Sequence, residues 1–157
     1  CRSFIVPLLG LLWSLDQSFR TRVEERLAPL VLRAATRVEC IPQAIAETLQ
    51  RYIDGTRTGE VALLRSAFTP AARVSGSYGG KPVSWTLPEF CDAVAKGGAV
   101  PGLQARVVSM EHAGGAAMAR LEALDWRGTR YTDFFVLVRS DEGWRIDSKV
   151  FCAHARA

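Results

Sequence analysis

The chain of 157 residues has little lysine, histidine or methionine. Its only lysines are Lys81, Lys96 and Lys149, so arginine supplies most of the basic charge. The formal net charge is +4, and the basic residues are spread along the chain without forming a block or stripe. Because binding through phosphate neutralisation needs concentrated positive charge, nucleic acid is not expected as a partner.

The four cysteines, Cys1, Cys40, Cys91 and Cys152, lie far apart and form no C-x-x-C motif. No histidine stands at metal-ligand spacing from them, so neither a metal site nor a cofactor is expected. An even number of cysteines leaves two disulfides open as an alternative, but a domain of this size can be stable without them. Free, mostly buried thiols are the favoured interpretation. The chain opens on Cys rather than Met, as expected of a fragment or of a processed chain.

The apolar run Phe4–Trp13 falls short of the roughly 18 to 20 residues that span a bilayer, so no membrane span is expected. It has the length of a signal peptide, but no small-x-small cleavage site follows it. We therefore expect a cytoplasmic protein whose apolar arm packs on the domain or on a partner chain, with secretion as the alternative. An amphipathic helix is expected from Asp16 to about Glu39. Residues 1–42 are thus assigned to an arm and a helix, and residues 43–157 to one folded domain.

The remaining sequence predicts an α+β domain in which helices come first and strands follow. Helices are expected over residues 43–56 and 59–68, and a third begins at the capping box Thr86-Leu87-Pro88-Glu89 and runs to about Lys96. A strand is expected over residues 72–78. Further strands over residues 104–112, 116–126, 129–139 and 144–152 are joined by glycine-containing connectors, which predicts a strongly bent antiparallel meander.

The last two of these strands form a predicted hairpin with one unusual feature. Along the first strand, Asp133 shares a face with Tyr131, Phe135 and Leu137. A carboxylate on an apolar face needs a hydrogen-bonded partner or a functional reason. Candidate partners are Tyr52, Trp126 or an arginine. Asp147 is expected at the surface, paired with Lys149 or Arg145.

Several of these segments together resemble the nuclear transport factor 2-like superfamily. The stretch Ile45–Gly55 followed by Phe68-Thr69-Pro70-Ala71-Ala72 is similar to the opening of that superfamily. The segments Tyr131–Phe134 and Gly143–Phe151 are similar to the closing hairpin of its lumazine-binding subgroup. The resemblance implies a cone-shaped, curved antiparallel sheet wrapped by about three helices, with a pocket between them. Members include ketosteroid isomerases, SnoaL-like cyclases, dehydratases, and modules that only bind or dimerise, so the fold does not fix the function.

The isomerase-like members imply roles for two residues of this chain. Tyr52 matches their tyrosine that donates to a developing oxyanion, and Asp133 matches their protonated aspartic acid that donates beside it. A carboxyl group in an apolar cavity has a raised pKa and can act as such a donor. Their general base falls near Ser75-Gly76-Ser77, where no carboxylate or histidine stands. His112 is a further candidate for proton transfer.

Three functions are compatible with these observations. The favoured one is a binding domain for a small apolar or aromatic molecule. The alternatives are an isomerase, dehydratase or cyclase using Tyr52 and Asp133, with His112 as a candidate base, and a homodimeric interaction domain that associates through its sheet. The ligand-binding residues predicted for the first are Tyr52, Trp85, Trp126, Tyr131, Asp133 and Phe135.

Overall fold

The computed structural model describes Glu25 and residues 41–154 of the chain. The chain divides into two units, Cys1–Cys40 and Ile41–Ala157. The predicted apolar arm and amphipathic helix therefore lie outside the described residues, apart from Glu25 and residues 41–42.

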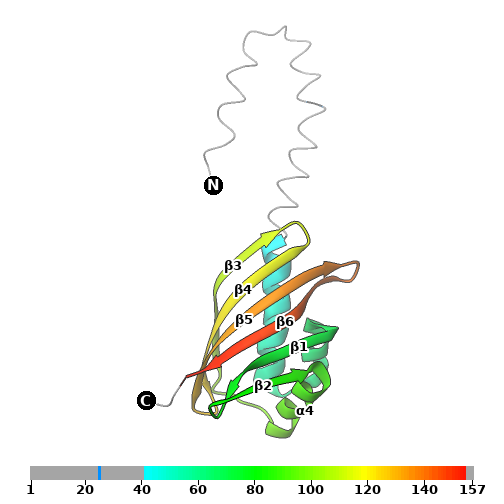
Figure 1. Ribbon diagram of the computed structural model, residues 1–157. Helices are drawn as coiled ribbons and strands as arrows, with labels where there is room; N and C mark the ends of the chain where they lie inside the picture. The colour runs from blue at the N-terminus through cyan, green and yellow to red at the C-terminus, as the bar shows by residue number, and fades with distance from the viewer. Residues whose placement is uncertain (1–24, 26–40, 155–157) are drawn as a thin grey trace. The chain divides into compact units, whose positions relative to one another are not determined.

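The second unit contains three helices and six strands in its described part (Figure 1). The first helix covers residues 41–58, and two shorter helices come after it, α3 (Val61–Ala67) and α4 (Leu87–Gly97). The strands are β1 (Phe68–Tyr78), β2 (Lys81–Thr86), β3 (Gln104–Ala113), β4 (Ala116–Trp126), β5 (Thr129–Ser140) and β6 (Gly143–Ala153). They form one sheet in the order β2-β1-β6-β5-β4-β3.

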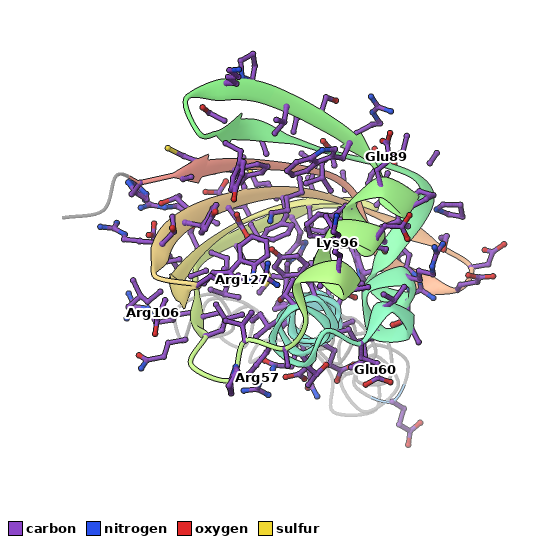
Figure 2. All side chains as sticks on the ribbon, turned by 90° about the horizontal axis from the view of Figure 1, so that it is seen from below. Arg57, Glu60, Glu89, Lys96, Arg106 and Arg127 are labelled. Atoms are coloured by element: carbon purple, nitrogen blue, oxygen red, sulfur yellow. The ribbon has the colours of Figure 1, made fainter. Side chains whose placement is uncertain are left out.

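The sheet curves around the helices, as the sequence predicts for an α+β cone. Figure 2 looks along the helix of residues 41–58, which lies inside the arc of strands, while α4 lies against the β1 and β2 end of that arc. Every neighbouring pair of strands is antiparallel except β1 and β6, which run parallel. The sheet is therefore mixed at this one pair. The buried core lies between the concave face of the sheet and the helices.

The capping box predicted at the start of α4 is confirmed. The Thr86 hydroxyl accepts from the Glu89 backbone N–H, and the Glu89 carboxylate accepts from the Thr86 backbone N–H. These two bonds satisfy donors that the first turn of a helix otherwise leaves unpaired. The Thr86 backbone N–H and the Thr86 hydroxyl both donate to the Glu89 carboxylate, which holds the pKa of Glu89 below its usual value.

The second strand is absent from the sequence prediction. β2 is a short edge strand that pairs with β1 through a turn at Gly79 and Gly80, both with positive φ. Two residues in this conformation are needed for a tight hairpin turn. Pro82 argues against a strand when the sequence is considered alone. It is tolerated in β2 because one side of an edge strand makes no ladder hydrogen bonds. β1 itself begins at Phe68 instead of Ala72.

The predicted helix over residues 43–56 is observed over residues 41–58, and it continues through Gly55. A Cβ at Gly55 would lie 2.9 Å from the Leu64 side chain, so the missing side chain lets α3 pack closely. The expected thiol burial holds for Cys91, which is buried and free. It is wrong for Cys152, which is free but exposed because it lies on the outward face of β6.

Candidate functional site

A cavity of about 440 Å³ opens between α4 and the strands of the sheet. Its volume lies within the usual range for small-molecule sites. Its walls are mainly aromatic and come from α4 and all strands except β3. The lining residues are Tyr78, Trp85, Phe90, Ala93, Val94, Trp126, Arg127, Thr129, Tyr131, Lys149 and Phe151.

Four of the aromatic rings of this cavity contact one another in a continuous wall. Trp85 stacks on Phe151 with ring centroids 5.8 Å apart and planes inclined by 13°. Tyr131 lies 5.9 Å from Phe151 and 5.0 Å from Trp126, in tilted and edge-on contacts. Gly76 on β1 makes room for this arrangement. A Cβ there would overlap the Phe151 carbonyl oxygen and approach its ring to 2.7 Å.

A lysine lies at the inner end of the cavity, among groups from three elements. Lys149 of β6 is 1% exposed, and its Nζ lies 3.0 Å from Asp133 Oδ2 of β5. The same Nζ donates to the Tyr52 hydroxyl at 2.6 Å, and that hydroxyl donates to Asp133 Oδ2 at 2.7 Å. Tyr52 comes from the helix of residues 41–58. Buried charges require this kind of pairing, because burial without it costs several kcal/mol per ion.

Aromatic faces surround the same ammonium group. Lys149 Nζ lies 4.9 Å from the ring centroid of Tyr52, 5.3 Å from Phe90, 5.9 Å from Trp126 and 5.4 Å from Phe151. A cation within about 6 Å of an aromatic face is attracted by the ring quadrupole, more strongly where water is excluded. The cage therefore offsets part of the cost of burying this charge.

Burial and the neighbouring Asp133 set the protonation of Lys149 and Tyr52. Desolvation lowers the pKa of Lys149, and the Asp133 carboxylate opposes that shift. Desolvation and the neighbouring Asp133 raise the pKa of Tyr52 well above its usual value, so Tyr52 stays a phenol. Asp133 Oδ2 faces two donors. This geometry suits an ionised acceptor, in contrast to the protonated donor that the family resemblance implied.

The residues predicted for ligand binding divide into three groups. Trp85, Trp126 and Tyr131 line the cavity. Tyr52 and Asp133 lie behind Lys149, beside a second space of about 10 Å³.

The third group is Phe135 alone, which lies deeper in the core with its ring 5.0 Å from that of Tyr52. Within the described residues, Asp133 Oδ1 and Trp126 Nε1 are buried without a hydrogen-bond partner.

His112 lies away from this site. It is exposed near the end of β3 and pairs with Ala117, which in turn pairs with Leu137. Leu137 lies four residues beyond Asp133 on β5, which corresponds to about 13 Å along a strand. His112 is therefore not placed to act on a ligand held at Asp133.

Lys149 is the residue that the sequence interpretation misses. The sequence predicts it at the surface beside Asp147, but Asp147 instead accepts a hydrogen bond from Thr69, and Lys149 is buried. The reason is a bulge in β6. Ser148 pairs with Val136 and Ile146 with Leu137, so Asp147 is an extra residue on its strand. One extra residue exchanges the faces of the strand, which turns Lys149 inward with Phe151.

The curved sheet, the enclosed helices and the cavity at the α4 end define the nuclear transport factor 2-like class of folds. A protein of this class from Shewanella baltica OS155, of unknown function, shares 28% identity over 72% of this chain and 93% of its own, with a TM-score of 0.68. Another, from Methylobacillus flagellatus KT and also of unknown function, shares 29% identity over 72% and 91%, with a TM-score of 0.69. The fold prediction is thereby confirmed.

A family model described as "Putative lumazine-binding" matches residues 42–152, and the chain belongs to this family. The search of curated proteins finds no match.

Within the described part of the chain, no helix is long and apolar enough to cross a membrane. In the same residues, no group of three or more His, Cys, Asp or Glu side chains could hold a metal ion. The cytoplasmic location stays a prediction.

Proposed function

We propose that the domain binds a small aromatic molecule in the 440 Å³ cavity in front of Lys149. The observation that carries this proposal is the combination of a continuous aromatic wall with one buried ammonium group at its inner end. Apolar walls with a few fixed polar groups are the usual composition of a ligand site. The family to which the chain belongs also supports a small-molecule ligand.

The charges around the cavity favour a ligand with an acidic or carbonyl oxygen. Lys149 and Arg127 are both among the lining residues, and none of the described lining residues is acidic. Arg127 donates to the Gly98 carbonyl at the end of α4, which holds its guanidinium near the cavity. A flat aromatic molecule would lie against the Trp85 and Phe151 rings and direct its oxygen toward Lys149.

The first test is the melting temperature of the full chain with a panel of pterins, flavins, steroids and polyketide-like aromatics. A ligand at 100 times its dissociation constant adds about 2.7 kcal/mol of stability. For a domain of this size, that free energy raises the melting temperature by roughly 10 °C. Absence of a shift with every member of the panel would contradict the proposal.

A pair of matched variants assigns any shift to the cavity. Ala93 is exposed on α4 and lines the cavity, whereas Ala95 is exposed on the same helix and does not line it. Ala93→Trp is expected to obstruct the cavity and abolish the ligand-induced shift. Ala95→Trp makes the same change in side-chain volume and helix propensity, so it should retain the shift. Equal behaviour of the two variants would place the ligand elsewhere.

A homodimer through the outward face of the sheet is supported by an apolar patch. Phe134, Val136, Val150 and Met118 are each about half exposed, and they lie side by side because Phe134 pairs with Val150 and Val136 with Met118. Contiguous exposed apolar side chains of this kind are typical of interaction surfaces. Light scattering of the full chain should give twice the monomer mass, and Phe134→Arg should reduce it to the monomer. A monomeric mass for the unmodified chain would refute the dimer.

A further inference from the structure

We propose that Lys149 is a nucleophile that forms a covalent imine with the carbonyl carbon of an aromatic aldehyde or ketone held in the cavity. The proposal rests on the proposed function, because the cavity must first hold the aromatic ring. It adds the chemical class of the ligand and a reaction with it.

The first support is the position of the amine. Among the described residues that line the cavity, Lys149 is the only lysine. Its side chain is almost fully buried and forms part of the cavity wall. Its Nζ lies within about 6 Å of the rings of Phe90, Trp126 and Phe151, which belong to the same wall. A ligand packed on these rings therefore has the amine beside it. Holding two reacting groups together in this way removes much of the entropic barrier to bond formation.

The second support is a route for the protons. The ammonium of Lys149 first gives one proton to the Asp133 carboxylate, 3.0 Å away, which leaves a neutral amine. The amine lone pair attacks the carbonyl carbon, and the carbonyl π electrons move to oxygen. The resulting adduct has a positively charged nitrogen and a negatively charged oxygen. One proton then moves from this nitrogen to the oxygen, which gives a neutral carbinolamine.

Loss of water completes the reaction. Asp133 returns its proton to the carbinolamine hydroxyl, the C–O bond breaks, and water leaves. The nitrogen lone pair forms the second C–N bond, giving a protonated imine. The overall change converts one ammonium and one carbonyl into one iminium and one water, and the Asp133 carboxylate is restored. Tyr52 donates to this carboxylate throughout and holds it in place at 2.7 Å.

The third support is the surroundings of the product. The iminium keeps the positive charge of the ammonium at the same nitrogen, so it keeps the Asp133 counter-charge and the aromatic cage. Both attractions apply equally to a cation of either kind. The low-polarity walls also limit access of the water that would hydrolyse the bond.

The other two lysines provide an internal comparison. Lys81 and Lys96 are exposed, whereas burial lowers the pKa of Lys149. An exposed lysine is almost entirely protonated at neutral pH, and a protonated amine does not attack a carbonyl.

The experiment treats the full chain with naphthaldehyde and sodium cyanoborohydride, which reduces an imine to a stable secondary amine. Tandem mass spectrometry of proteolytic peptides then measures the adduct at each lysine. We expect Lys149 to carry more adduct than Lys81 or Lys96, because the cavity holds the aldehyde beside its amine. Ala93→Trp should abolish the adduct at Lys149, and Ala95→Trp should retain it.

A parallel melting curve with naphthalenemethanol separates the two proposals, since this alcohol has the same rings but no carbonyl. A thermal shift with the alcohol and no preferential adduct with the aldehyde overturns the imine and leaves aromatic binding in place. No shift and no adduct at Lys149 overturns both. Equal labelling of all three lysines overturns the imine, since it shows only the reactivity of exposed amines.

Discussion

Removing one member of the buried Lys149 and Asp133 pair should destabilise the domain far more than removing both. The side chains are 1% and 2% exposed, and their charged atoms are 3.0 Å apart. Either Lys149→Met or Asp133→Leu leaves one charge buried without its partner, which costs about 3–5 kcal/mol. The double variant leaves neither charge. Its main remaining cost is the Tyr52 hydroxyl without an acceptor, about 1–3 kcal/mol.

Urea denaturation of the full chain, followed by tryptophan fluorescence, measures the four free energies of unfolding in this cycle. The two single changes together predict about 6–10 kcal/mol if they are independent, so the expected coupling is at least about 3 kcal/mol. Asp54 and Arg57 provide a matched control, because they form an exposed ion pair at 2.6 Å. Their coupling should stay below about 1 kcal/mol. Additive effects at Lys149 and Asp133 would show that the two charges do not stabilise each other in the folded protein.

The same pair predicts a pH dependence in Asp133→Asn. Burial lowers the pKa of Lys149, and the Asp133 carboxylate opposes this shift. The variant removes the opposing charge, so the folded protein releases the Lys149 proton at a lower pH than the unmodified protein does. Between that pH and the unfolded value near 10.4, the unfolded chain binds more protons, and stability rises with pH. The difference in unfolding free energy between the unmodified protein and the less stable variant should therefore shrink from pH 7 to pH 9. A constant or growing difference would contradict this expectation.

Three further changes test the parts that support the site. Glu122→Gln should cost about 1 kcal/mol at neutral pH after solvent screening, since hydrogen bonds from neighbouring arginines lower the pKa of Glu122 to about 2. That cost should fade as the pH drops from about 4.5 through 2, because stability from a lowered carboxyl pKa is lost on protonation; a cost that persists in acid would exclude the ion pairs as its source. Gly76→Ala should displace Phe151, destabilise the protein by about 1–3 kcal/mol and abolish ligand-induced thermal shifts, whereas an unchanged melting curve would show that the strands separate easily. Thr86→Ala should cost about 1 kcal/mol through loss of the capping box with Glu89, which urea denaturation would detect.

Much of the fold can be predicted from local sequence signals. The α4 capping box and the long strands with glycine connectors lie where the sequence predicts them, because each signal acts within a few residues. The inward face of β5, with Tyr131, Asp133 and Phe135 buried, also agrees with simple alternation. The edge strand β2 is not predicted, because a proline such as Pro82 argues against a strand. Its position at the edge of the sheet, which tolerates proline, is known only from the structure.

The central group of the site depends on longer-range structure. The family resemblance brings Tyr52 and Asp133 together, and the structure places them 2.7 Å apart. Lys149 cannot be placed by alternation, since the extra residue Asp147 in β6 reverses the faces after Ile146. A bulge depends on the pairing of two strands, which no single segment specifies. The only sequence signal for the burial of Lys149 is its position two residues before Phe151, because residues two apart on a strand lie on the same face.

Whether the aromatic cavity is the ligand site is tested most directly by the NMR signals of the lysine side chains, recorded while naphthoate is added to the full chain. With only three lysines in the sequence, the Lys149 signals can be separated from those of Lys81 and Lys96. If the aromatic cavity is the ligand site, the Lys149 ε-methylene signals should shift through the ring current of the bound naphthoate and reach saturation, while the other two stay unchanged. Unchanged Lys149 signals at a naphthoate concentration that shifts the other lysines would contradict the assignment of this cavity as the ligand site.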